Sequence, residues 1–514
     1  MLKIPLAVWI ANAAACLTGT YGDVTHQAEA ADCSRQTVSD QAQKVQAAVE
    51  AEHAGGPTHA ELIPENEQLR QENARLWDWL AQTIEFPASK RHEFTVTATA
   101  MGLSLNQVLV LLALLLGAQA RPGRSTIQRW IKAAGQRAAG VLKHLDRRCR
   151  TLVLVGCLDE IFFRHRPVLV GVEPASMVWF LGRKASDRQG ATWCQELQGW
   201  TALQHVVADA GTGLQAGIAL VQQQRLACEQ APLENGRDVF HTAQEARRVL
   251  KLSWNRVERL WEQAEAATRR IEQTQRQGRD ARDAAATAYW AWKRAARAFH
   301  QFEEAEEGWR LAQTALQLFR PDGRLNDRLG AVQQVTSALP KLSGRDWSKV
   351  RGSLQAKETF TFLDRLHHQL RAAEPDEGLR GELVRLWWLR RRRPRGSSSG
   401  VIAGSGHVAH LVQMVVCSKW GPHWRQSYRR ISGVLRQTVR ASSAVECMNS
   451  VLRMHQARHR TVTQELLDLK RLYWNCRAFR AGKRRGRCPY EHLGLKLPRY
   501  DFWSVLQTAA DEAA

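Results

Sequence analysis

The chain has 514 residues, which corresponds to three or four domains at about 150 residues per domain. Hydrophobic residues make up 44% and charged residues 24%, a composition that supports folded cores and excludes global disorder. Lys and Arg number 73 against 50 Asp and Glu, so the net charge is +23. This excess predicts a polyanionic partner, most simply nucleic acid, with an acidic membrane surface as the weaker alternative.

The cysteines and apolar runs limit where such a chain would act. None of the ten cysteines forms a CxxC pair, which disfavours a zinc ribbon and is typical of reduced, intracellular proteins. The longest apolar run, 108–116, falls far short of the roughly 20 residues that span a bilayer. Residues 2–16 look like a weak secretion signal, but the segment after them is more typical of a DNA-binding motif than of the start of a mature secreted protein. We expect a cytoplasmic, nucleoid-associated protein with no membrane partner.

Residues 1–56 predict a helix-turn-helix. Two helices over 24–50 flank a tight turn at 32–34, and Ser34 can cap the second helix. That helix opens with Arg35, Gln36 and Ser39, the positions that reach base edges in this motif. An ordinary helical hairpin is the alternative.

Residues 57–88 predict a short zipper-like helix. Leu62, Leu69 and Leu76 recur every seven residues, which places Asn66, Asn73 and Leu80 at the a positions. An a-position Asn favours a dimer in one register. Because three heptads are few, an amphipathic helix packed on its own domain is the alternative.

Residues 89–150 predict a second helical DNA-binding unit. A buried helix over 105–116 leads through a turn at 120–123 into another helix. One face of that helix is apolar, and the other carries Arg124, Arg129 and Lys132. A core helix with a solvated basic face is an equally good interpretation.

Between 151 and 241 the hydrophobic period changes to that of strands. Short strands are predicted over 152–158, 168–172, 177–181 and 203–208, with helices over 189–199 and 214–227. Asp159 belongs to the first strand, and Asp209 ends the fourth. This segment is expected to be the first part of a catalytic core.

Residues 242–440 predict an all-helical insertion with a connector. Breaks are expected near 321–323 and Pro375, and 396–400 reads as a flexible linker. Among the tryptophans of the Arg-rich helices, most are expected in the core and one or two are expected to stack on flipped bases; these are Trp254, Trp261, Trp290, Trp292 and Trp309. Arg390 and Arg391 are candidate phosphate contacts.

Residues 441–514 are expected to complete the core. Ser443 to Glu446 has the spacing of a capping box at the start of a helix. The tail is strongly basic, and Lys483, Arg484 and Arg485 are further candidate phosphate contacts.

Three acids suggest the chemistry: Asp159, Asp209 and Glu446. In an RNase H-like core, strands one and four are neighbours and a late helix packs across them, which would bring these carboxylates together. Carboxylate clusters suit Mg²⁺. Two such ions can activate a water or a 3′-hydroxyl and stabilise the leaving oxygen of a phosphodiester.

The motifs around these acids resemble those of bacterial insertion-sequence transposases with a DDE catalytic core of the RNase H-like, retroviral-integrase type. The similar stretches are 157–160, 206–211, 443–453 and the tail 482–495. The resemblance implies an α/β core interrupted by the helical insertion and preceded by the DNA-binding units. It implies Asp159, Asp209 and Glu446 as catalytic ligands of two Mg²⁺ ions, with Mn²⁺ as a substitute. It also implies double-stranded DNA, at element ends and target, as the substrate of a homodimer or larger assembly.

Several alternatives stay open. Glu446 could be the capping-box residue of its helix, and Glu160 could replace Asp159. Asp238 could replace Asp209 or assist it, together with His241 on the same helix face. A non-catalytic DNA-binding regulator derived from a transposase, or an RNase H-like nuclease, would show the same features.

Overall fold

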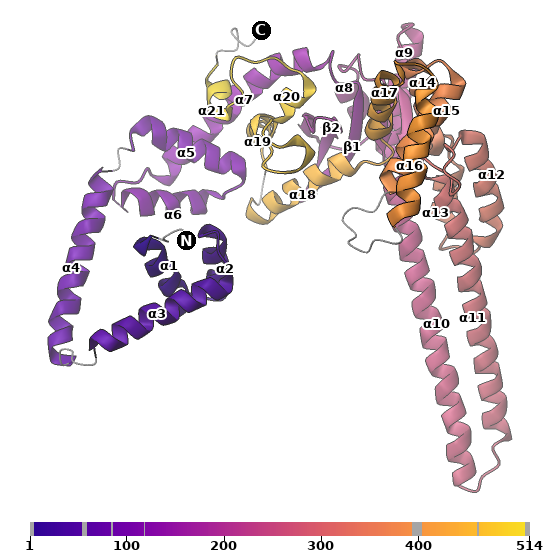
Figure 1. The fold of residues 1–514 in the computed structure, drawn as a ribbon, viewed down its shortest axis with the longest axis horizontal. Coiled ribbons are helices and arrows are strands. Elements are labelled where there is room, and N and C mark those ends of the chain that lie inside the picture. The colour runs from indigo at the N-terminus through magenta and orange to yellow at the C-terminus, as the bar shows by residue number, and fades with distance from the viewer. Residues whose placement is uncertain are drawn as a thin grey trace. The chain divides into compact units, whose positions relative to one another are not determined.

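The computed structural model describes residues 5–53, 59–83, 86–117, 119–392, 403–459 and 462–508 (Figure 1). These residues divide into two compact units, the first spanning 1–87 with 115–119, and the second spanning 88–114 with 120–514. The described chain is mostly helical and contains one mixed sheet of five strands. The α/β class is therefore confirmed.

The first unit consists of α1 (Leu6–Leu17), α2 (Asp23–Ala30), α3 (Arg35–His53) and α4 (His59–Thr83). The Ser34 hydroxyl accepts a hydrogen bond from the backbone N–H of Thr37 at 3.0 Å, so it caps α3 as predicted. A buried hydrogen bond of 2.6 Å from Asn12 to Gln41 ties α1 to α3. The predicted order of helix, turn and helix over 24–50 is confirmed, whereas its role stays a prediction.

Two of the heptad leucines of α4 are exposed within the first unit. Leu69 and Leu76 are each about half exposed. These leucines are therefore open to a partner helix, which is the arrangement that heptad spacing favours.

The sheet of the second unit has the strand order β3-β2-β1-β4-β5. Its strands are β1 (Val155–Phe163), β2 (Arg166–Val172), β3 (Trp179–Lys184), β4 (His205–Ala208) and β5 (Glu234–Arg237). The β2 strand pairs antiparallel with β1 and β3, whereas β1, β4 and β5 run parallel. The sequence does not predict β5, because Glu-Asn-Gly-Arg lacks any apolar pattern and pairs only because β4 lies beside it.

Helices cover both faces of this sheet (Figure 1). On one face, α18 (Ser443–Arg458) packs Val445, Met448 and Leu452 against inward-pointing residues of β1, β2 and β4. On the other face lie α7 (Arg124–Cys149), α8 (Gly190–Leu197) and α9 (Thr212–Ala227). Successive strand residues point to opposite faces, so each residue's position in its strand decides which layer it joins.

One expectation about the helices before the sheet is wrong. These helices are α5 (Ala88–Met101) and α6 (Leu105–Leu116), and α6 is not a buried helix. Val108 and Leu112 are buried, but Val110 and Leu114 are exposed. A continuous apolar run has no polar face, so its sequence does not say which side the core covers.

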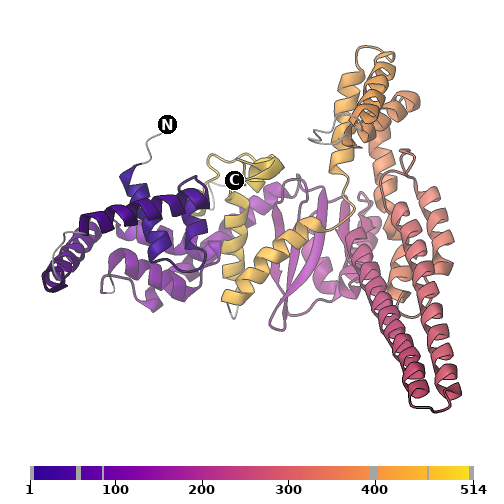
Figure 2. The ribbon, with the colours of Figure 1, turned by 60° about the horizontal axis from the view of Figure 1, so that its bottom comes forward.

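The helical insertion begins with a long hairpin in which α10 (Val239–Arg276) and α11 (Arg282–Ala315) lie side by side (Figure 2). It continues through α12 (Arg328–Ala338), α13 (Ser348–Gln355), α14 (Thr361–Ala373), α15 (Glu377–Arg392), α16 (Ala403–Ser418) and α17 (Trp424–Gln437). The breaks predicted near 321–323 and Pro375 are confirmed. The predicted linker at 396–400 lies outside the described residues.

The hairpin tryptophans contradict the expected core placement. Trp254, Trp261, Trp290 and Trp292 are 38 to 56% exposed, whereas Trp309 is buried. The two helices meet through the small side chains of Ala264, Ala291 and Ala295. Two helices bury only the face that each turns toward the other. Because alanines occupy that contact face, the large tryptophan rings lie at its edges, partly exposed to solvent.

The chain ends in α19 (Gln464–Cys476), α20 (Pro489–Leu493) and α21 (Phe502–Gln507), which complete the core beside α7. All ten cysteines are free thiols. Within the described ranges, no helix combines the length and apolarity needed to cross a membrane.

Candidate active site

The sheet places Asp159 and Asp209 beside each other on the face covered by α18. Leu158 of β1 pairs with Ala208 of β4, so the next residue of each chain segment is the adjacent aspartate. Both Leu158 and Ala208 point to the opposite layer, as their place in the α7 core shows. By alternation, Asp159 and Asp209 both point toward α18.

Asp159 is held by two donors. Its Oδ1 accepts the backbone N–H of Glu160 at 2.8 Å, and its Oδ2 accepts the side-chain amide of Asn449 from α18 at 2.6 Å. Burial raises the pKa of Asp159 to about 7. The hydrogen bond from Glu160 opposes this rise, and the charges of Asp209 and Glu446 add to it. Asp209 and Glu446 therefore both lie within electrostatic reach of Asp159.

Glu160 points away from this site. Its carboxylate accepts a hydrogen bond of 2.7 Å from Arg188, on the other side of the sheet. The strand's alternation thus favours Asp159 over Glu160 as the acid that faces Asp209 and Glu446.

Glu446 lies in the first turn of α18 and does not cap it. The N-cap residue is Ser442, and no side-chain capping hydrogen bond forms there. Instead, Glu446 Oε1 lies 3.2 Å from His241 Nε2, and Oε2 lies 3.8 Å from the guanidinium of Arg453. The capping-box interpretation is therefore wrong, and the Glu446 carboxylate faces the site.

Asp238 joins the two ends of the insertion. It is the N-cap of α10, where Oδ1 accepts the backbone N–H of Phe240 at 2.6 Å and that of His241 at 3.4 Å. Its Oδ2 accepts the backbone N–H of Ser442 at 3.1 Å and also the Ser442 hydroxyl. This buried carboxylate is fully occupied, so it orients His241 and the start of α18 rather than replacing Asp209.

A cavity of about 460 Å³ opens beside these residues. Asp209, Asp238 and His241 line it together with the start of α10 and part of α13. Its cationic side chains are Arg237, Arg248 and Lys349, of which Arg248 pairs with the Glu245 carboxylate of the same lining at 2.6 Å. The cavity thus brings cations beside the candidate acids, with one of the three cations already neutralised.

The donor types fit Mg²⁺, but their spacing does not yet form an ion site. Carboxylate oxygens are the ligands that Mg²⁺ prefers, and Asp159, Asp209 and Glu446 supply them. Across the described part of the chain, no three Asp, Glu, His or Cys side chains are grouped tightly enough to hold a metal ion as they stand. Binding would require these side chains to turn toward one another.

The predicted DNA contacts are spread over separate elements. Arg35 and Gln36 are exposed at the start of α3, and Ser39 is half-buried. The side chains exposed elsewhere are Arg124, Arg129 and Lys132 on α7, Arg390 and Arg391 at the end of α15, and Lys483 and Arg485 in the tail. Arg391 stacks on Trp387 at 5.0 Å, and half-buried Arg484 donates to the backbone carbonyls of Pro174 and Ala175.

The sequence interpretation did not find Asn449. This residue is fully buried and holds Asp159 in place, yet its own carbonyl oxygen has no hydrogen-bond partner. A polar residue within the apolar stripe of Val445, Met448 and Leu452 was the available signal, because a buried amide needs a partner.

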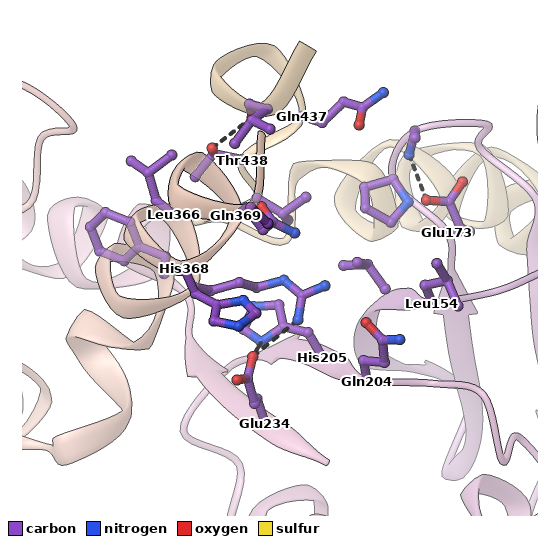
Figure 3. Close-up of a pocket in the computed structure, with 18 of the residues that line it drawn as sticks. Leu154, Glu173, Gln204, His205, Glu234, Leu366, His368, Gln369, Gln437 and Thr438 are labelled. Carbon is purple, nitrogen blue, oxygen red and sulfur yellow. Dashed lines mark hydrogen bonds and ion pairs between the residues drawn. The ribbon is translucent and has the colours of Figure 1, made fainter. Parts of the chain in front are cut away.

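A separate cavity of about 710 Å³ lies at the opposite end of β4 from Asp209 (Figure 3). His205, the first residue of β4, is 1% exposed there. The Arg365 guanidinium hydrogen-bonds Glu234 beside it at 3.0 Å. Burial, and secondarily the charge of Arg365, lowers the pKa of His205 to about 3.

His205 is therefore expected to make the fold acid-sensitive. The folded state favours neutral imidazole, so its contribution to stability is present above the ordinary pKa of 6.5 and is lost as pH falls toward 3. Between pH 7 and pH 5, His205 should cost about 2 kcal/mol of unfolding free energy. Denaturant titrations of the wild type and His205→Phe at both pH values measure this. An equal pH dependence in the two proteins would exclude His205 as the source.

No protein-family model, curated protein or solved structure matches this chain.

Proposed function

We propose that this chain is a DNA transposase with an RNase H-like core, which cleaves element ends and joins the freed 3′-hydroxyl to target DNA. The observation that carries the proposal is the placement of Asp159, Asp209 and Glu446 on one face of the sheet, with Asp209 and Glu446 both within electrostatic reach of Asp159. Neighbouring first and fourth strands and a late helix across them are what an RNase H-like core requires. The net charge of +23 supports a DNA substrate.

In this function, bound Mg²⁺ would activate the attacking water or 3′-hydroxyl and stabilise the leaving oxygen. Asp159 and Asp209 would hold the ions from neighbouring strands, and Glu446 would complete the site from α18. Asn449 keeps the Asp159 carboxylate oriented, and His241 contacts Glu446. Burial raises the pKa of Asp159 to about 7, and a nearby cation would favour its charged form.

The direct test uses a plasmid that carries the DNA flanking the coding sequence of this chain. The full-length protein with Mg²⁺ or Mn²⁺ should nick that DNA and then join its 3′ ends to a second plasmid. Binding without nicking would indicate the non-catalytic regulator instead. Nicking without joining would indicate the nuclease.

DNA affinity should fall steeply with salt, because counterions leave the duplex when Lys and Arg neutralise its phosphates. For six to ten contacts, log K against log salt should have a slope of about −5 to −9. Fluorescence anisotropy with a labelled duplex between 0.05 and about 0.3 M salt measures it. A slope near zero would remove nucleic acid as the main partner.

Residues 1–85 should bind element ends through α3, as a dimer joined by α4. An Arg or Gln bidentate to a base edge contributes roughly 1–3 kcal/mol of discrimination. Arg35→Ala or Gln36→Ala should therefore lower the ratio of specific to non-specific binding about five- to a hundredfold. Leu69→Lys should instead weaken binding by separating the dimer, and a high protein concentration should restore the binding. If the fragment is monomeric and binds element ends no better than random DNA, this role is wrong, and α7 becomes the candidate for end recognition.

A further inference from the structure

A second cavity, of about 660 Å³, opens at the start of α18 and is strongly basic. Its walls come from the end of α17 and the segment after it, the first turns of α18, the loop at 174–177 and the C-terminal tail. Four permanently or normally cationic side chains line it: Arg436, Arg440, Lys483 and Arg484. No Asp or Glu is among its lining residues, all of which the structure describes.

The four cations lack carboxylate partners within the described residues. Arg440 donates to the backbone oxygen of Leu316 at 2.8 Å and to the side chain of Gln317 at 3.1 Å. Arg484 donates to the backbone oxygens of Pro174 and Ala175. Both guanidinium groups thus point at neutral acceptors, and Arg436 and Lys483 are exposed at the rim. An anion that enters the cavity would meet four cations and no carboxylate among the lining residues.

Glu173 is the acid that lies within electrostatic reach of Arg484, but it forms no ion pair with that guanidinium. Its carboxylate accepts hydrogen bonds from its own turn, at 3.0 Å from the Ala175 N–H and 2.6 Å from the Ser176 N–H. It lines the neighbouring cavity of Figure 3, where Glu234 also pairs with Arg365. That neighbouring cavity is lined by two carboxylates, Glu173 and Glu234, and one guanidinium, Arg365, so an anion is better accommodated in the basic one.

The basic cavity and the candidate active site share α18. Ser443, Ala444 and Cys447 face the cavity, whereas Glu446 and Asn449 face Asp159 from another side of the same turns. Because these two sets of residues alternate along the same turns of α18, a DNA phosphate in the cavity would be close along the DNA strand to a phosphodiester at the three acids.

We propose that this basic cavity binds a backbone phosphate of the DNA strand next to the phosphodiester being cleaved. The inference rests on the proposed function and identifies a contact for its substrate. It adds Arg436 and Arg440 to the tail residues as parts of one phosphate site. The ligand chemistry is a phosphate group, and a free phosphate compound would share it.

The experiment compares two double variants of the full-length chain without divalent metal. Arg436→Gln with Lys483→Gln removes two exposed cations from the cavity. Arg429→Gln with Lys496→Gln removes the same charge from α17 and the tail, outside the cavity. The probe is a labelled 40-base-pair duplex of random sequence, measured as a function of salt.

The cavity variant should bind the duplex roughly 10- to 60-fold more weakly at 0.1 M salt, with a salt slope about 2 smaller in magnitude. The control variant should stay within about twofold of the wild type. Equal binding by both variants would overturn the proposal, even if the wild type cleaves DNA normally. A wild type that binds no duplex at any salt would instead refute the proposed function.

A second arm distinguishes the source of the phosphate. Inorganic pyrophosphate is added at constant ionic strength. If pyrophosphate binds the wild type but not the cavity variant, and does not displace the duplex, the cavity holds a free phosphate compound and the DNA assignment is wrong. Displacement of the duplex from the wild type that the cavity variant does not show supports DNA.

Discussion

Asp159→Asn, Asp209→Asn and Glu446→Gln should each reduce metal-dependent cleavage by about a thousandfold or more, with DNA affinity nearly unchanged. Metal ligation needs the carboxylate charge, whereas binding depends on Lys and Arg. The measurement is nicking of supercoiled plasmid in Mg²⁺, together with duplex binding in its absence.

Glu160→Gln is the matched control, because it lies on the same strand but faces Arg188 across the sheet. Its cleavage rate should stay within a few-fold of the wild type. If Glu446→Gln cleaves normally, the triad assignment is wrong and another late acid must be sought. If Glu160→Gln alone abolishes cleavage, the first acid has been misassigned.

Asp159→Asn should also stabilise the metal-free protein. The raised pKa of Asp159 means that the folded state disfavours its charged form, so stability is lost as pH rises from 3.8 through about 7. Asp159→Asn removes this buried charge and should raise the unfolding free energy by about 1–2 kcal/mol at pH 8. Unchanged or lower stability at pH 8 would contradict a burial cost for the charged Asp159 carboxylate.

Asp238→Ala should have the second large effect, on stability and cleavage together. It removes the acceptor for Phe240, His241 and Ser442, and leaves buried donors unpaired where α10 and α18 begin. The expected loss of unfolding free energy is about 3 kcal/mol. Cleavage should fall at least about a hundredfold, because small displacements of catalytic groups carry such costs.

Asp501→Ala is the control that distinguishes the loss of a helix cap from the loss of a residue that positions the active site. Asp501 caps α21 by accepting the backbone N–H of Ser504 at 2.8 Å, and it makes no contact with the site. Its replacement should cost about 1 kcal/mol of stability and leave cleavage unchanged. Both variants are assayed at a temperature where circular dichroism shows them fully folded. Normal cleavage by folded Asp238→Ala would show that Asp238 does not position Glu446.

The sequence by itself determined the features that depend on neighbouring residues. Ser34 capping α3, the strands around Asp159 and Asp209, and the breaks at 321–323 and Pro375 follow from local rules of capping, alternation and proline geometry. Strand β5 and the exposure of α6 and of the hairpin tryptophans could not be predicted. Their state depends on which distant surface covers them.

The candidate site divides in the same way. Asp159, Asp209 and Glu446 were identified from their motifs, but only the tertiary structure chose between Asp159 and Glu160. The pairing of β1 with β4 fixes which residue faces α18. The tertiary structure also showed that Asp238 accepts hydrogen bonds from Ser442 and that Asn449 donates one to Asp159. It further showed that Arg436 and Arg440 line one cavity together with the tail. These contacts join residues far apart in sequence, and no spacing or periodicity encodes the distance between segments that meet only when the chain folds.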